Sequence, residues 1–188
     1  MTSGAPRRVL DLWPQRANTA SESLEILDEV AKWLRSRNVQ GQWPSSFTAP
    51  SPGDVPRDRV AEIKRYAYDG QLWVLRDGRL GDTAVATFAV SERPDPDFAA
   101  SWPGGPGDAR YLYRMAVRRI ACGQGVGGLC VDFALWLARA AGVSWLRLDC
   151  SKSNAALHAY YQRLGFTRVG TAEVPGRLSG ALFERPVR

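Results

Sequence analysis

The feature that most constrains the fold is a run of glycines between an expected strand and an expected helix. Residues 111–117 have a β-strand pattern, and residues 126–141 form a long apolar stretch that Gly142 ends, as is typical of helices. The turn between them is Cys122-Gly123-Gln124-Gly125-Val126-Gly127-Gly128. Glycines let a backbone approach a ligand closely, and a helix start presents unpaired N–H groups and a positive dipole end. The segment therefore predicts a site for an anion such as a pyrophosphate.

Two common nucleotide sites use similar glycines but need further residues. A phosphate loop of the GxxxxGK[ST] type requires a lysine, and no lysine follows these glycines. A dinucleotide fold requires a βαβ unit near the N-terminus and an acidic partner for the ribose, and the turn lacks that context. The sequence thus disfavours a nucleotide hydrolase and a dehydrogenase.

The remaining periodicity is typical of a mixed α/β protein. Apolar residues recur at helical intervals over residues 21–37, and Thr19 and Glu22 before them have the spacing of a capping box. The proline-rich stretch 93–108 is expected to form neither strand nor helix. Together the segments predict a central mixed sheet of six or seven strands flanked by about four helices, in a single domain over residues 1–188. Further helices are expected at 58–67 and 154–163, an antiparallel hairpin at 72–75 and 83–90, and strands at 8–12, 145–150, 166–174 and 180–185.

Composition excludes several classes of protein. Three cysteines form no CxxC pair and His158 is the single histidine, so neither a disulfide framework nor a metal site is indicated. No apolar stretch approaches the roughly 20 residues of a membrane span, and the first six residues contain no signal-peptide core, so a cytoplasmic protein is expected. Residues 1–103 carry 13 Lys+Arg and 14 Asp+Glu, net −1, whereas residues 104–188 carry 12 and 5, net +7. A polyanionic ligand is therefore expected on the second half.

Four features in one register carry a resemblance to a known family. They are Val117 five positions before the glycine turn, Leu146-x-Leu148, Asn154, and Tyr161-x-x-x-Gly165-Phe166. In this register the chain resembles the GNAT superfamily of N-acetyltransferases, best over residues 110–170. The resemblance implies the GNAT fold with a splayed cofactor cleft, and an acyltransferase of class EC 2.3.1 that uses acetyl-CoA and no metal.

The resemblance also implies roles for residues of this chain. Tyr161 would be the general acid that protonates the departing thiolate. An amide near Met115 or Val117, whose main chain would pair with the pantetheine arm, would face the thioester oxygen. Asp149 ends a strand near the expected acyl position and is a candidate general base, although pairing with an arginine explains it equally well. Cofactor contacts are expected from the main chain or side chains of Met115, Val117, Cys122, Gly123, Gln124, Gly125, Val126, Gly127, Gly128 and Asn154.

One position departs from the family pattern. Arginine or glutamine is usual where this chain has Cys122, so one side-chain contact to phosphate is missing. Arg118, Arg119 and Gln124 are candidates to replace it, and backbone amides would otherwise bind the diphosphate alone.

Several single residues also have structural explanations. Tyr161 has the spacing of a helix core position, Asn154 that of a helix cap, and for His158 packing is favoured over catalysis. The aromatic residues Trp43, Trp102 and Tyr68 fall in or beside expected loops, where they favour an acceptor with a flat or apolar part.

The sequence is therefore interpreted as an N-acetyltransferase that moves acetyl from acetyl-CoA to a primary amine of a small molecule or peptide by direct attack. One alternative keeps the fold but uses a longer acyl-CoA or an aminoacyl-tRNA, of which the tRNA is not favoured. A second is an acyl-CoA sensor without catalysis. The acceptor and the oligomeric state, a homodimer included, stay open.

Overall fold

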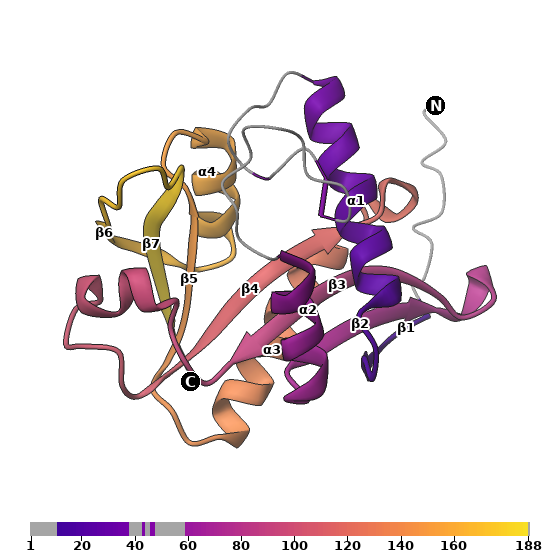
Figure 1. Cartoon of the computed structure of the whole chain (residues 1–188). Helices are drawn as coiled ribbons and strands as arrows, with labels where there is room; N and C mark the ends of the chain where they lie inside the picture. The colour runs from indigo at the N-terminus through magenta and orange to yellow at the C-terminus, as the bar shows by residue number, and fades with distance from the viewer. Residues whose placement is uncertain (1–10, 38–42, 44–45, 48–58, 188) are drawn as a thin grey trace, which may run out of the picture.

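Seven strands form one sheet in the computed structural model, which describes residues 11–37, 43, 46–47 and 59–187 (Figure 1). The strands are β1 (Leu12–Arg16), β2 (Leu72–Asp77), β3 (Thr83–Ser91), β4 (Ala109–Val117), β5 (Trp145–Ser151), β6 (Thr167–Thr171) and β7 (Ser179–Pro186). Their spatial order is β1-β2-β3-β4-β5-β7-β6. Strands β4 and β5 are parallel, and every other neighbouring pair is antiparallel. The mixed α/β class expected from the sequence is confirmed.

Four α-helices occur in the described part of the chain and cover the two faces of the sheet (Figure 1). Helices α1 (Ser21–Ser36) and α2 (Arg59–Tyr68) lie on one face, and α3 (Val126–Ala140) and α4 (Ala155–Arg163) lie on the other. Three short 3-10 turns connect elements: η1 (Gly78–Leu80), η2 (Pro96–Ser101) and η3 (Arg119–Ala121). None of the helices in the described ranges is both long and apolar enough to cross a membrane.

Apolar side chains on both faces of the sheet form two layers of core. On one face, the stripe of α3 that includes Cys130, Val131 and Ala134 is fully buried against the central strands. On the other face, α1 buries Ile26 and Leu27 against the sheet and α2. Each helix thus faces the sheet with an apolar stripe. Because helices cover both faces, β3 is buried along nearly its whole length.

The parallel strands β4 and β5 are paired only near their N-terminal ends. Residues 109–111 of β4 lie beside residues 145–147 of β5, and the pairing stops there. Beyond that point β4 is paired only with β3, and residues 148–151 of β5 are paired only with β7. The divergence opens the sheet in its middle, as the splayed cleft of the sequence prediction requires.

The expected capping box at the start of α1 is wrong. The N-cap residue is Ala20, and no side chain caps the helix. Glu22 instead binds Arg76 of β2, with an Nη2–Oε2 distance of 2.6 Å. A tertiary ion pair therefore replaces the local hydrogen bond that the spacing predicted.

Two further expectations differ from the structure. The proline-rich stretch does contain a helical turn, η2, because the Asp95 carboxylate accepts from the N–H of Asp97 and Pro96 stands at a first position that needs no N–H donor. The first strand begins at Leu12 instead of ending there, and residues 8–10 lie outside the described residues. Pro14 is tolerated in β1 because β1 is an edge strand.

Candidate active site

The opening between β4 and β5 belongs to a cavity of about 1940 Å³. Leu157 and Tyr161 of α4 line it from one face of the sheet, and Glu62 and Tyr66 of α2 line it from the other. The cavity therefore connects the two faces through the gap in the sheet. Two ligands that enter from opposite faces can meet there.

The glycine turn lies where α3 begins, on the face that also carries α4. Gly123 and Gly125 have φ angles of +77° and +81°, and a Cβ at either position would meet no atom within 4 Å. These left-handed conformations, which glycine adopts without strain, lead the chain into α3. The N–H groups of residues 123–127 donate to no backbone carbonyl among the described residues. Open space beside unpaired donors at a helix start fits a pyrophosphate.

The remaining residues of the turn pack against the protein. A Cβ at Gly127 would collide with the hydroxyl of Tyr160, so the absence of a side chain lets α3 and α4 pack closely. The side chain of Gln124 turns back, and its Nε2 donates to the carbonyl of Ile120 at 3.0 Å. Backbone groups, not side chains, therefore dominate the open side of the turn.

The two arginines before the turn are also engaged. Arg118 binds Glu29 of α1 at 2.7 Å. Arg119 lies over the ring of Trp33, with its Cζ 4.1 Å from the ring centroid, and its Nη1 donates to the exposed Cys122 sulfur at 3.0 Å. The two arginines thus tie α1 to the end of β4, and whether either contacts phosphate stays a prediction.

A β-bulge interrupts β4 beside the gap. Between Tyr113 and Ala116 two residues of β4 face one residue of β3, and Arg114 has a φ of +52°, which is uncommon for a residue with a side chain. The bulge leaves Met115 and Val117 packed on the α3 face while Arg114 reaches α2. The β4 edge that faces β5 is unpaired beyond residue 111, so its main-chain groups border the gap.

Tyr161 lines the cavity from α4. Its ring is buried, with centroids 5.7 Å from Phe166 and 6.1 Å from Phe183. Burial raises the pKa of the Tyr161 phenol above its ordinary value, so the group stays protonated at neutral pH. No described residue makes a hydrogen bond with its hydroxyl. The Tyr161 phenol is therefore a protonated group at the border of the cavity.

Asn154 and His158 both have structural contacts at α4. The Oδ1 of Asn154 accepts from the N–H of Leu157 at 3.0 Å, which is an N-cap bond. The Nε2 of His158 lies 2.7 Å from the carbonyl oxygen of Ser151, and its ring packs beside Phe183. His158 therefore ties α4 to β5, and Asn154 caps the start of α4.

Asp149 of β5 lines the cavity beside the gap in the sheet. Burial raises its pKa above the ordinary value, and the charge of Arg114 and a hydrogen bond with Ser179 partly oppose that shift. No lysine or arginine among the described residues forms an ion pair with it. An ion pair between Asp149 and an arginine, the structural explanation that the sequence offered, is therefore absent among the described residues.

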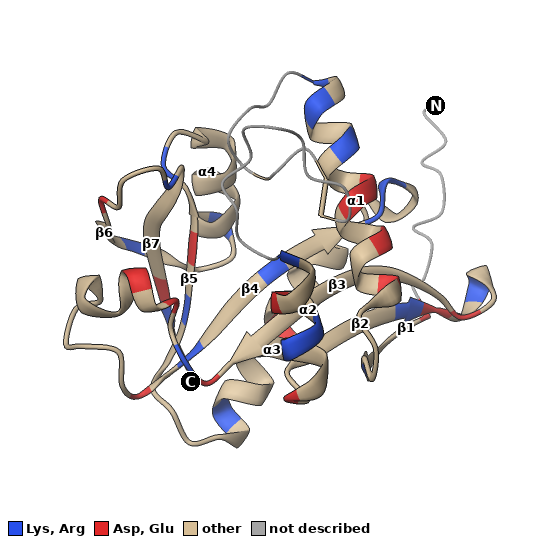
Figure 2. Cartoon of the chain, viewed as in Figure 1, with Lys and Arg blue, Asp and Glu red and all other residues tan. Residues whose placement is uncertain are grey.

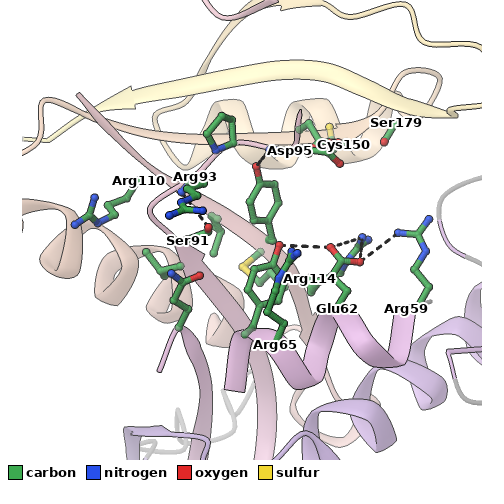
Figure 3. Close-up of a pocket in the computed structure, with 18 of the residues that line it drawn as sticks. Arg59, Glu62, Arg65, Ser91, Arg93, Asp95, Arg110, Arg114, Cys150 and Ser179 are labelled. Atoms are coloured by element: carbon green, nitrogen blue, oxygen red, sulfur yellow. Dashed lines mark hydrogen bonds and ion pairs between the residues drawn. The ribbon is translucent and has the colours of Figure 1, made fainter. Parts of the chain in front are cut away.

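The α2 face of the cavity contains an ion-pair cluster that sequence reasoning missed. The Nη2 of Arg114 lies 2.7 Å and 3.0 Å from the two carboxylate oxygens of Glu62, and Arg59 approaches the same carboxylate at 3.8 Å (Figure 3). The hydroxyl of Tyr66 donates to Glu62 at 3.4 Å. Glu62 and Arg114 are 52 positions apart and the bulge sets their contact, so no local pattern identifies the pair.

A second cluster joins two loops at the edge of the cavity. Arg177, in the turn between β6 and β7, binds Asp95 at 2.8 Å and Asp97 at 2.7 Å, and its Cζ lies 4.5 Å from the ring centroid of Phe98. The N–H of Asp95 also donates to the hydroxyl of Tyr113 at 2.6 Å. These contacts hold the η2 loop against the last two strands and fix one wall of the cavity.

The three loop aromatics singled out in the sequence have different positions. Trp43 lines the cavity, where the stacked rings of Tyr66 and Tyr113 also lie, with centroids 6.1 Å apart. Trp102 is buried in the core beneath η2, and Tyr68 is 92% exposed outside the cavity. Of the three, only Trp43 can contact an acceptor in this cavity.

Carboxylates of the first half of the chain bind much of the positive excess of the second half. The acidic residues of α1 precede its basic ones, α2 carries charges of both signs, and the charged residues of β4 are both arginines (Figure 2). The ion pairs between the halves are Arg110–Glu92, Arg114–Glu62, Arg118–Glu25, Arg118–Glu29, Arg177–Asp95 and Arg177–Asp97.

Within the described ranges, no three His, Cys, Asp or Glu side chains are grouped as metal ligands.

Residues 27–166, well over half of the chain, match the acetyltransferase (GNAT) family. The chain belongs to this family. The GNAT chain is 28% identical over 163 residues to the uncharacterized N-acetyltransferase YesJ of Bacillus subtilis (strain 168). The aligned region covers 86% of this chain and 82% of YesJ. The resemblance found in the sequence, and with it the acyltransferase class EC 2.3.1, is confirmed.

Solved structures share the fold of this GNAT chain. A GNAT-family acetyltransferase from Listeria monocytogenes has a TM-score of 0.67 at 21% identity, and the match covers 94% of this chain and 95% of the Listeria chain. The yncA protein of Salmonella typhimurium, solved with its cofactor acetyl-CoA, has a TM-score of 0.59 at 14% identity and covers 94% of each chain.

Proposed function

We propose that this GNAT enzyme transfers an acetyl group from acetyl-CoA to a primary amine of a small molecule or peptide. The observation that carries the proposal is the cavity, which joins the glycine-turn face of the sheet to the α2 face through the gap beside Tyr161 and Asp149. Through such a passage, a donor bound on one face of the sheet can meet an acceptor bound on the other face. Family membership supports acyl transfer as the reaction.

The donor would bind on the α3 face. Unpaired N–H groups of residues 123–127 would hold the diphosphate, and the free edge of β4 at Met115 and Val117 would pair with the pantetheine arm. Asn154 would border the reactive end of the cofactor from the start of α4. When bound, acetyl-CoA supplies an acetyl thioester whose carbonyl carbon an amine can attack.

Two side chains would move the protons. Asp149 takes a proton from the acceptor ammonium, directly or through one water, and the neutral amine then forms the C–N bond. As the C–S bond breaks, Tyr161 would donate its proton to the departing sulfur, and the second proton that the nitrogen loses on becoming an amide would restore the Tyr161 phenol through water. A main-chain N–H at the β4 edge would stabilise the charge on the carbonyl oxygen. The raised pKa of Asp149 makes it a stronger base than an ordinary carboxylate.

The proton-donor role is tested by Tyr161→Phe, which removes the hydroxyl and keeps the ring. General acid catalysis contributes about 10²- to 10⁴-fold, so kcat is expected to fall within that range. Thermal stabilisation of the protein by acetyl-CoA should stay at the wild-type value. Tyr68→Phe, an exposed tyrosine outside the cavity, is the matched control, and a wild-type kcat in Tyr161→Phe would contradict the assignment.

The reaction itself is tested with acetyl-CoA and a panel of primary amines, by following the release of free thiol. Saturable thermal stabilisation at low micromolar acetyl-CoA, together with turnover of at least one amine, is the expected result. Stabilisation without turnover of any amine would favour an acyl-CoA sensor. Strong salt-dependent binding of tRNA instead would favour the aminoacyl-tRNA alternative.

A further inference from the structure

The arginines that line the cavity differ in whether the protein itself gives them a partner. Among the described lining residues there are seven arginines, and six have an ion pair or lie over an aromatic ring. The pairing of these six is Arg16 over Trp73, Arg65 over Tyr66, Arg59 and Arg114 with Glu62, Arg110 with Glu92, and Arg177 with Asp95 and Asp97.

Arg93 is the exception. Its main-chain N–H donates to the Oγ of Ser91 at 3.1 Å, but its guanidinium has no ion pair, hydrogen bond or ring contact with any described residue. The side chain is exposed and lines the cavity from the loop after β3. A cation with five N–H donors and no partner at the entrance of a cavity is suited to bind an anion.

The carboxylates of the cavity show a complementary exception. Four of them form ion pairs with arginines of the protein: Glu62, Glu92, Asp95 and Asp97. Asp69 is exposed at the entrance, where α2 ends, whereas Asp149 lies beside the gap in the sheet with no ion pair. Asp149 is thus a half-buried carboxyl group beside the gap that no described cation pairs with.

The two unpaired groups lie in different parts of the cavity. In the close-up, Arg93 lies toward one end, and Ser179, on the strand β7 that pairs with β5, lies toward the other (Figure 3). Arg65 lies between them, and its guanidinium, 5.7 Å from the ring centroid of Tyr66, forms no ion pair with a described carboxylate. The cavity therefore contains a carboxyl group beside the gap and an exposed guanidinium on the loop after β3, neither of which has an ion pair with a described residue.

We propose that the acceptor carries an anionic group in addition to its amine, and that Arg93 is a specificity-determining residue that binds this group. The proposal rests on the acetyl transfer proposed above. Asp149 receives the ammonium near the thioester, and Arg93 holds the anion, with Arg65 beside it. A carboxylate and a phosphate share this chemistry, so amino acids and phosphorylated amines are the two classes of acceptor that fit.

Matched pairs of acceptors test the proposal with and without the anion. L-phenylalanine is compared with L-phenylalaninamide, and phosphoethanolamine with ethanolamine, by kcat/KM at fixed acetyl-CoA. Because Arg93 is exposed, the anionic member of one pair is expected to be favoured about fivefold, through KM, and Arg93→Gln should remove that preference. The pair that responds identifies the carboxylate or the phosphate as the anion.

Arg139→Gln provides the control, because Arg139 is an exposed arginine in the last turn of α3 and does not line the cavity. It should keep the wild-type preference. The proposal would be overturned if neither pair showed a preference for its anionic member, or if Arg93→Gln left such a preference unchanged.

A binding measurement separates this inference from the reaction. If no amine is acetylated, the proposed acetyl transfer to amines is wrong. The anion site can then still be tested by binding. The thermal stabilisation of the CoA-bound protein by N-acetyl-L-phenylalanine and by N-acetyl-O-phosphoethanolamine is compared with the stabilisation by their neutral analogues. Greater stabilisation by an acid, lost in Arg93→Gln, supports an anion site at Arg93. The absence of any difference between acid and neutral analogue rejects that site.

Discussion

The two faces of the cavity are built from the chain in different ways. On the side of α4, the lining residues and the nearby glycine turn come from one continuous stretch, residues 122–164, in which backbone groups and close helix packing dominate. The α2 side combines α2, the loop after β3, the β4 bulge and the turn before β7, and ion pairs hold these segments together. Under the proposed function, the donor would be bound mainly by local backbone structure, whereas the acceptor would be selected by side chains that come together only through long-range contacts.

The largest expected effect is at the point where the two sides meet. Asp149→Asn keeps the shape of the side chain but removes the base, so kcat should fall by about 10²- to 10⁴-fold while acetyl-CoA binding is unchanged. The wild-type rate should also decline as pH falls through the raised pKa of Asp149, and the variant should lose this dependence. Asp132→Asn, an exposed residue of α3, is the control, and an unchanged pH profile in Asp149→Asn would reject the base.

Asp149→Asn should lower kcat but raise the stability of the folded protein. Because burial raises the pKa of Asp149, the folded protein binds its proton more tightly than the unfolded chain does, and ionisation at higher pH reduces stability. Asp149→Asn should therefore have a higher melting temperature than the wild type at pH 8. The difference should disappear below the unfolded pKa of about 3.9. A lower melting temperature for the variant at pH 8 would mean that Asp149 mainly stabilises the fold.

The second prediction tests whether ion pairs define the acceptor side. Glu62→Gln removes one partner of a charge-assisted pair worth about 1.5–3 kcal/mol, so kcat/KM for the acceptor should fall about ten- to hundredfold. The KM for acetyl-CoA should not change. Glu22→Gln is the matched control, because Glu22 also accepts two hydrogen bonds from one arginine, Arg76, but lies outside the cavity. Equal kinetic losses in both variants would show a general effect on the fold.

The same difference explains what could be read from the sequence. The glycine turn, α3 and the hairpin of β2 and β3 were predicted correctly, since helix period, strand alternation and glycine signals are local. The bulge at Arg114 was not, because its register depends on pairing with β3. The count of charges along the chain predicted a polyanion site on the second half, yet contacts such as Arg177–Asp95 bring first-half carboxylates to many of those arginines. Such contacts exist only after folding.

The third prediction concerns the backbone of the glycine turn. Gly125→Ala places a side chain at a φ of +81°, which costs about 1–2 kcal/mol, and relief of that strain would move the N–H groups that are proposed to bind the diphosphate. The Kd for acetyl-CoA should therefore rise about tenfold. Gly142→Ala has a similar φ, +70°, at the other end of α3, so it should lose similar stability and keep the wild-type Kd. An equal rise in Kd in both variants would place the effect in the helix, not the turn.

The smallest expected effect concerns the apolar part of the acceptor. Trp43 is the one of the three loop aromatics that lines the cavity, and its ring packs edge-to-face on Phe47, with centroids 5.4 Å apart. Trp43→Ala should raise the acceptor KM about fivefold, in line with about 1 kcal/mol for an aromatic contact. Trp102→Phe, in the core and outside the cavity, is the control. If the KM for L-phenylalanine and for phosphoethanolamine rises equally, Trp43 shapes the cavity, whereas a rise for L-phenylalanine alone indicates contact with an apolar body. That difference would show whether charge alone, or charge with an aromatic surface, selects the acceptor.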